Sequence, residues 1–212
     1  MSGFVRRAEP VHLRVAGPQW TMVAPLPGMP TLPIMIINMF LAARNAVLRR
    51  FAASDHPPAT VPAVDLDRYL GTWFEVARLP NLEADGFGRR CVDVTATYTK
   101  RPDGLIGVQT VSYNAAAGMR RTEVNGTARP VNPGGSKLLL TFYYVVRGDH
   151  WIVGLDPDYR WSLVGTPSRR RLWLMSRTPH LDPVAFDQAM AVALVQGYDP
   201  ARVRPTPQTA AA

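Results

Sequence analysis

The sequence predicts an all-β fold, an eight-stranded antiparallel up-and-down barrel with a C-terminal α-helix packed outside it. Three observations lead to this prediction. Eight short strand candidates, separated by turn residues at regular spacing, fill residues 68–179, as is typical of a β-sandwich or barrel. The candidate at 91–99 alternates apolar and polar side chains, which indicates one buried and one wet face. An amphipathic helix pattern follows at 183–196.

The first strand, Gly71–Arg78, is the element onto which the other strands close. A large ring at Trp73, placed after a glycine that allows close backbone approach, suits the closed end of a small barrel. Because side chains alternate along a strand, one face should carry Trp73, Glu75 and Ala77. The other face should carry Phe74, Val76 and Arg78.

Turn residues delimit the remaining elements. Proline, glycine, asparagine and aspartate cluster between them, for example at 101–104 and 147–149. The helix should follow Asp182 as its N-cap and end at Gly197. We expect its apolar stripe to cover the eighth strand; the stripe consists of Phe186, Ala189, Met190, Ala193 and Leu194. The other strand candidates are 91–99, 105–113, 121–131, 137–145, 150–155, 161–166 and 171–177.

Composition limits the partners that we expect. The net charge is +8, but 22 of the 24 basic residues are Arg, a pattern that a GC-rich coding sequence produces without a charged partner. No basic helix or aromatic groove motif points to nucleic acid. The single cysteine, Cys91, excludes an intrachain disulfide and a cysteine-based zinc site. The four histidines are scattered without metal-ligand spacing, so we expect no metal, no cofactor and no nucleic acid.

The 212 residues divide into three parts. We expect an N-terminal extension at 1–63, a barrel with its helix at 64–200, and a disordered tail at 201–212. The extension is rich in proline and ends in a linker at 54–62.

The function of the extension stays open at this level. Residues 15–43 contain no Asp, Glu, Lys or Arg, and the densest apolar run is 32–43, shorter than the ~20 residues of a membrane-spanning helix. One interpretation is a secretory signal or anchor. A second is a helix from Pro33 that lies on a membrane surface. A third is an internal start codon at Met29 or Met35.

Separated segments of the domain carry a family resemblance. They read Arg-Tyr-Leu-Gly-Thr-Trp-Phe-Glu-Val-Ala-Arg at 68–78, Val-Thr-Ala-Thr-Tyr at 94–98, Asp-Pro-Asp-Tyr at 156–159 and Leu-Trp-Leu-Met-Ser-Arg-Thr-Pro at 172–179. In this order they resemble the lipocalin family, most closely bacterial outer-membrane lipocalins and apolipoprotein D. The resemblance implies the lipocalin calyx, closed by Gly71, Trp73 and Arg177, with the guanidinium stacked on the indole.

The chain departs from the family pattern at two places. Many bacterial members are anchored through a lipidated cysteine, and no cysteine precedes Cys91 here. We therefore expect a location in the bacterial cell envelope, in the periplasm or at the outer membrane, without that anchor. The corner at 156–158 reads Asp-Pro-Asp where the family commonly has Thr-Asp-Tyr, so only the turn itself is expected to be shared.

Parity, apolar faces and the family resemblance give the predicted ligand-binding side chains. If Trp73 and Arg177 meet inside the closed end, side chains of the same parity point inward. Val94, Ala96, Thr110 and Gly126 should share the inner face. The predicted ligand-binding set is Glu75, Ala77, Tyr98, Val124, Leu138, Leu140, Phe142, Tyr144, His150, Ile152, Trp173 and Met175.

Two members of this set are ionisable. Glu75 in an apolar barrel should be protonated, paired with an arginine or bound to a ligand, or it is a hydrogen-bonded structural residue. His150, at a predicted strand start, would titrate near the mouth or lie on a surface hairpin.

An elongated acyl chain suits a cavity lined by apolar, small and aromatic groups. We therefore expect a non-enzymatic protein that holds a fatty acid or lysophospholipid for storage or transport and that associates with membranes. Pairing of two chains stays open. One alternative is an enzyme acting through Cys91, which parity places on the outward face with Asp93 and Thr95. Another is an interaction module whose barrel is filled by its own side chains.

Overall fold

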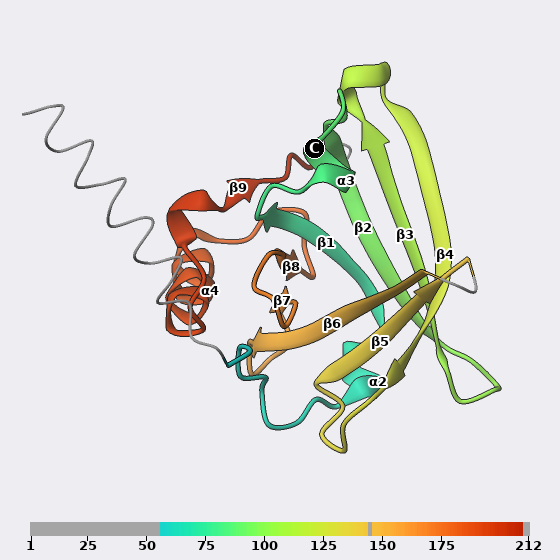
Figure 1. Cartoon of the computed structure of the whole chain (residues 1–212), viewed down its shortest axis with the longest axis vertical. Coiled ribbons are helices and arrows are strands. Elements are labelled where there is room, and N and C mark those ends of the chain that lie inside the picture. The colour runs from blue at the N-terminus through green and yellow to red at the C-terminus, as the bar shows by residue number, and fades with distance from the viewer. Residues whose placement is uncertain (1–55, 144–145, 210–212) are drawn as a thin grey trace, which may run out of the picture. The chain divides into compact units, whose positions relative to one another are not determined.

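The structure is a computed structural model that describes residues 56–143 and 146–209, and these form a closed antiparallel barrel (Figure 1). The strands pair in the order β2-β3-β4-β5-β6-β7-β8-β1, and the additional pairing of β1 with β2 closes the ring. The predicted fold class is thus confirmed. The strands are β1 (Gly71–Arg78), β2 (Cys91–Lys100), β3 (Ile106–Asn114), β4 (Arg120–Pro130), β5 (Lys137–Phe142), β6 (Val146–Leu155), β7 (Trp161–Gly165) and β8 (Leu172–Ser176).

Short elements occupy the connections and the C-terminal part. A ninth strand pairs with the outer end of β1. The helices are α2 (Leu66–Tyr69), α3 (Leu82–Asp85), the 3-10 turn η1 (Ala115–Ala117), α4 (Pro183–Val195) and the 3-10 turn η2 (Pro200–Arg202); the ninth strand is β9 (Arg204–Pro205).

The closed end of the barrel is built around Trp73, which is completely buried. Its indole nitrogen donates a hydrogen bond to the Tyr69 carbonyl at 2.8 Å. The Arg177 guanidinium lies 3.8 Å from the centre of the indole ring and donates to the carbonyls of Thr72 and Arg68. Gly71 has φ +91, a conformation that glycine adopts freely and that strains residues with a side chain. Glycine therefore suits the start of β1 beside Arg177.

Helix α4 packs outside the barrel and begins as predicted. The Asp182 side chain accepts a hydrogen bond from the Ala185 amide at 2.9 Å. The helix contacts β6 and β7 rather than mainly β8, because Gly154 of β6 lets it approach: a Cβ there would lie 2.8 Å from Val192. Leu194, predicted in the buried stripe, is 62% exposed. The apolar stripe of α4 is therefore rotated toward the alanines on its inner face.

Strand β6 begins earlier than the sequence indicates. The predicted turn at 147–149 is strand, because Arg147, Gly148 and Asp149 pair with residues of β5. The chain instead reverses between Phe142 and Val146, which face each other across the hairpin. As a result His150 lies in the middle of a strand.

A β-bulge in β1 overturns the predicted parity of its last residues. Met175 of β8 pairs with Glu75, but its neighbour Leu174 pairs with Ala77, so one residue is skipped. Ala77 therefore joins the outer apolar cluster beneath α4. Arg78 pairs with the inward-facing Trp173 and turns to the inside of the barrel.

The tail predicted to be disordered is folded as far as the structure describes it. We call residues 204–209 the C-terminal strap. The Thr206 amide donates to the Val76 carbonyl on β1, and the Asp93 amide on β2 donates to the Pro207 carbonyl. The Gln208 side chain donates to carbonyls of both strands, those of Glu75 and Val94. Beyond Phe74, β1 and β2 no longer pair with each other, and the strap bridges them there.

The predicted extension falls largely outside the described residues, as do the interpretations placed on residues 1–55. The last part of the predicted linker lies against the barrel. The Val61 amide donates to the Ile152 carbonyl, and the Val64 amide donates to the Gly134 carbonyl. Across 56–143 and 146–209, the structure contains no helix that is both long and apolar enough for a membrane crossing.

Candidate functional site

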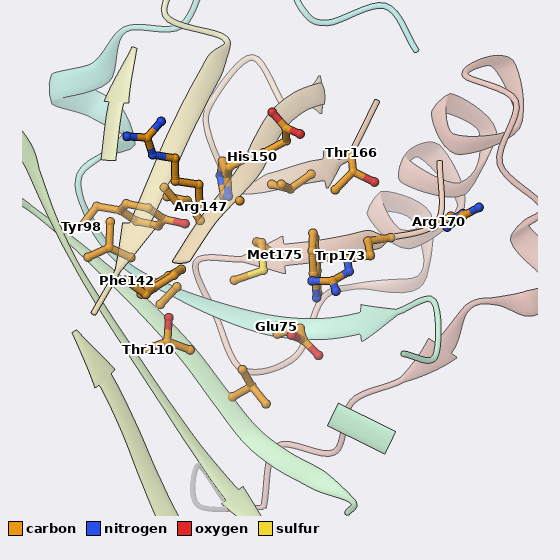
Figure 2. Close-up of a pocket in the computed structure, with 18 of the residues that line it drawn as sticks. Glu75, Tyr98, Thr110, Phe142, Arg147, His150, Thr166, Arg170, Trp173 and Met175 are labelled. Atoms are coloured by element: carbon orange, nitrogen blue, oxygen red, sulfur yellow. The ribbon is translucent and has the colours of Figure 1, made fainter. Parts of the chain in front are cut away.

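A cavity of about 620 Å³ lies inside the barrel (Figure 2). Its volume is within the ~300 to 1,000 Å³ range of small-molecule sites. Figure 2 shows side chains from β1, β6 and β8 converging on it. The lining residues are Glu75, Val94, Ala96, Tyr98, Val108, Thr110, Leu140, Phe142, Arg147, Gly148, Asp149, His150, Val164, Thr166, Pro167, Ser168, Arg170, Arg171, Trp173 and Met175.

The structure brings together most, but not all, of the predicted ligand-binding residues. Those that line the cavity are Glu75, Tyr98, Leu140, Phe142, His150, Trp173 and Met175. Leu138 and Ile152 are fully buried in the apolar cluster around Trp73. Val124 pairs with the lining residue Thr110 but does not itself line the cavity. Because of the bulge, the Ala77 side chain lies on the outer face of the barrel. Tyr144 is not among the residues that the structure describes.

His150 lies deep in the barrel, not at the mouth. The Tyr69 hydroxyl contacts the His150 Nε2 at 3.4 Å and the Ser162 Oγ at 3.2 Å. The Tyr98 ring lies edge-on to His150 with ring centres 5.8 Å apart. Burial lowers the pKa of His150 to about 4, and burial raises the pKa of Tyr98 well above its usual range. The inner part of the cavity is therefore polar but uncharged at neutral pH.

A buried ionic cluster forms the wall near the strap. Arg78 Nη1 donates to Glu75 Oε1 at 2.7 Å and to the Thr206 hydroxyl at 2.9 Å. The Thr206 hydroxyl in turn donates to Glu75 Oε1 at 2.7 Å. Arg78 Nη2 contacts Asp85 at 2.5 Å. The sequence left several states open for Glu75, and the structure shows it paired with an arginine.

The two carboxylates that share Arg78 differ in acidity. Burial raises the pKa of Glu75, while Arg78 and Thr206 oppose that rise. The hydrogen bond from Arg78 lowers the pKa of Asp85, which is partly exposed. Burial opposes the charge of Arg78, but its hydrogen bonds with Asp85 and its attraction to Glu75 raise its pKa. The arginine is therefore a permanent cation, and Glu75 is the weaker acid of the pair.

The mouth of the cavity carries cationic side chains. Arg147 comes from the start of β6, and Arg170 and Arg171 come from the loop between β7 and β8. Arg171 forms an ion pair with Glu83 of α3. Arg147 and Arg170 are exposed and form no ion pair within the described part of the chain. Asp149 is the acidic residue among the lining groups of β6. The mouth therefore favours an anionic group.

The barrel is closed by an arginine stacked on a buried indole, encloses a cavity and carries a helix on its outside. These features can be compared with those of known proteins. The family model of the lipocalin-like domain matches residues 64–208. The chain belongs to the lipocalin family.

Relatives of this lipocalin occur in bacteria, plants and animals. Outer membrane lipoprotein Blc of Escherichia coli K12 is 34% identical over 167 residues, which cover 77% of this chain and 92% of Blc. Temperature-induced lipocalin-1 of Arabidopsis thaliana is 34% identical over 158 residues, or 70% and 82% of the two chains. Apolipoprotein D of Bos taurus is 22% identical over 135 residues, or 60% and 68%.

A solved structure supports the lipocalin fold independently. Insecticyanin from the tobacco hornworm Manduca sexta superimposes with a TM-score of 0.58 at 16% identity, covering 74% of this chain and 87% of insecticyanin. This likeness shows a shared barrel architecture.

Cys91 of this lipocalin does not line the cavity. The sequence placed it on the outward face, but a second bulge between Val92 and Thr95 shifts the register, and Cys91 pairs with Asn114 on the inner face. The side chain is buried. Within the described residues, His, Cys, Asp and Glu form no group of three suited to a metal ion.

Sequence reasoning missed several residues around the site. Tyr69 lies before the first strand, so strand parity did not include it, although its large ring in an apolar lead-in could have marked a buried plug. Arg78 was assigned outward because a bulge leaves no clear signal in a single sequence. Thr206 and Gln208 act through hydrogen bonds in a segment without periodicity. Arg147 was assigned to a turn that the structure shows as strand.

Proposed function

We propose that this lipocalin binds a lipophilic molecule with one long apolar chain and an anionic head group, a fatty acid or a lysophospholipid. The observation that carries the proposal is the distribution of groups along the cavity. Apolar side chains such as Val108, Leu140 and Phe142 line its body, and Arg147 and Arg170 stand at its mouth. The apolar chain would enter first and the head group would remain beside the arginines.

The energetics of this arrangement are favourable. Each methylene removed from water contributes about 0.8 kcal/mol, part of which offsets the entropy lost on association. The charged head would avoid the low-dielectric interior, where an unpaired charge is costly. Glu75 already has a partner in Arg78, so a carboxylate ligand would not meet an isolated negative charge in the wall.

The relatives support a proposal for the biological role. We propose lipid storage or transport in the bacterial cell envelope, because outer membrane lipoprotein Blc is 34% identical to this chain over most of its own length. Binding without chemical conversion is the activity proposed, since Cys91 is not among the cavity-lining residues.

Uptake of a dansyl-labelled fatty acid by the purified full chain tests this function. We expect saturable binding of one probe per barrel. Ala96 lines the cavity and is 7% exposed, so Ala96→Trp should fill the site and abolish uptake. The matched control is Val184→Trp, which adds an indole at a position that is 67% exposed on α4 and should bind as the unaltered chain does.

Two results would overturn the proposal. One is the absence of uptake by the unaltered chain, which would favour a filled barrel that serves as an interaction module. The other is equal uptake by the Ala96→Trp and Val184→Trp variants, which would place the probe outside the cavity. The head-group assignment has its own comparison: Arg147→Gln with Arg170→Gln should weaken binding of the fatty acid but not of its methyl ester.

A further inference from the structure

Exposed apolar side chains gather at the open end of the barrel. Phe87, in the turn after α3, is 92% exposed, and Leu82 of α3 is 67% exposed. Met119, in the turn between β3 and β4, is 43% exposed. We call residues 82–90 and 115–120 together the rim tip. Figure 1 shows α3 and the connection between β3 and β4 at the same end of the barrel.

Hydrogen bonds join the two turns of the rim tip into one surface. The Ala115 amide donates to the Arg90 carbonyl at 2.9 Å. The Arg90 amide donates to the Asn114 side-chain oxygen at 3.0 Å. The ion pair between Glu83 and Arg171 connects the same segment to the mouth of the cavity. The rim tip therefore lies beside the entrance through which a ligand passes.

The backbone of the rim tip makes its apolar residues costly for the fold. Phe87 has φ +52 and Met119 has φ +60, a region that L-residues with bulky side chains rarely adopt and that glycine adopts freely. Phe87 gains almost no burial to compensate for this conformation, and Met119 remains 43% exposed. Large apolar groups at two such turn positions are thus unexplained by the stability of the barrel alone.

Charge at the rim tip is unbalanced. Arg89, Arg90 and Arg120 are exposed, and their guanidinium groups form no ion pair among the described residues. The neighbouring acids are each neutralised by another arginine; the pairs are Glu83 with Arg171, Asp85 with Arg78, and Glu123 with Arg121. Exposed arginines without an ion pair therefore stand next to Phe87 and Met119 in the sequence.

We propose that the rim tip docks on a membrane surface that carries anionic phospholipids. Phe87 and Met119 would enter the boundary between head groups and acyl chains, and the arginines would contact phosphates, as in interfacial segments that combine apolar and basic residues. Docking would place the cavity mouth against the source of its ligand. The inference extends the proposed function, but vesicle binding and fatty acid uptake are measured separately, so each can fail alone.

A fluorescent label at the rim tip reports docking directly. The full chain is prepared as Cys91→Ala with Phe87→Cys and labelled with the environment-sensitive probe NBD. Vesicles of phosphatidylcholine with phosphatidylglycerol should shift the emission of the label to the blue and brighten it, and added salt should reduce the change. Phosphatidylcholine alone should have little effect. The control carries the label at Val184→Cys on α4, which should stay in water.

This design separates the rim tip from residues 1–55, whose composition could itself attach the chain to a membrane. If those residues alone bind the vesicles, the chain co-sediments while the label at position 87 remains in water, and the proposal is wrong. An equal response of the labels at 87 and 184 would also overturn it. A response that needs a second protein rather than vesicles would mark the rim tip as a protein-binding surface instead.

The charge contribution has a matched test. Replacing Arg89 and Arg120 with glutamine should lower the affinity of the labelled chain for anionic vesicles about 25-fold, since each surface arginine near an anionic leaflet contributes about fivefold. Arg129 is also exposed but lies at the opposite end of β4 from Arg120. Arg129→Gln should leave vesicle binding nearly unchanged, whereas Arg120→Gln alone should lower the affinity about fivefold. Equal losses in these two single variants would contradict docking through the rim tip.

Discussion

At the closed end of the barrel Trp73 is completely buried, whereas at the open end Phe87 is 92% exposed. The buried indole has a hydrogen-bond acceptor for its nitrogen and an arginine stacked on its face. The exposed ring stands on a left-handed turn, next in the sequence to arginines that form no ion pair among the described residues. Trp73 therefore has packing and hydrogen-bond partners within the fold, whereas the Phe87 ring is exposed to solvent. This difference indicates that the closed end stabilises the fold and the open end is available for binding.

Truncating the two rings should give the largest contrast between the ends. Trp73→Ala removes a fully buried side chain and should lower the free energy of unfolding by about 4 kcal/mol, through lost burial and the cavity left behind. Phe87→Ala should change it by less than about 0.5 kcal/mol, as expected for an exposed position. Urea unfolding followed by circular dichroism measures both. Similar losses of unfolding free energy in the two variants would show that both ends contribute equally to stability.

The closed half should also give the protein its sensitivity to acid. His150 has a folded pKa of about 4, below the ~6.5 of an unfolded histidine. As pH falls through this window, the unfolded chain takes up a proton that the folded chain refuses, so stability is fully present above pH ~6.5 and is lost toward pH ~4. At about 1.4 kcal/mol for each pH unit, the loss approaches about 3 kcal/mol.

The control for this effect is His150→Gln, which keeps a polar side chain but cannot titrate. Unfolding free energies measured from pH 7 to pH 4 should fall less steeply in this variant than in the unaltered chain. Parallel curves would mean that the acid sensitivity arises elsewhere. The carboxylates with lowered pKa, such as Asp85 and Asp156, lose their contribution as pH falls further, through their folded pKa values.

The sequence was sufficient for the barrel because its signals are local. Turn residues, alternation and the Asp182 cap act within a few residues. The structure has strands and helix α4 where these signals occur, except at 147–149, where a predicted turn is strand. The site was harder to predict from the sequence, because one skipped residue in β1 exchanges the faces of Ala77 and Arg78. As a consequence Arg78, which neutralises Glu75, was assigned to the outer face of the barrel, and the ionic cluster was not predicted.

Segments without periodicity were the second source of error. The C-terminal strap is held by single hydrogen bonds to two strands rather than by an apolar stripe, and such bonds leave no pattern in a single sequence. The exposed arginines of the mouth were overlooked for a different reason. Arginine is common throughout this chain, so these residues did not stand out in the sequence. Their role depends on which loops the fold brings together.

The C-terminal strap offers the finest test of how the two ends differ, because it closes the gap between β1 and β2 on the open side. Thr206→Val removes the hydroxyl that bonds both Glu75 and Arg78 while keeping the side-chain volume. The expected loss of unfolding free energy is about 2 kcal/mol, because both lost partners are charged. Thr99→Val, at an exposed position on β2, serves as the control and should be close to neutral.

Hydrogen exchange shows whether that loss is local to the strap. The amides of Thr206 and Asp93 are bonded across the strap, and both should exchange faster in Thr206→Val, whereas amides of β7 at the closed end should be unaffected. This outcome would mean that the strap opens as a unit while the floor around Trp73 stays folded. Uniform acceleration throughout the barrel would instead show that the two ends unfold together, and that the strap is part of a single cooperative structure.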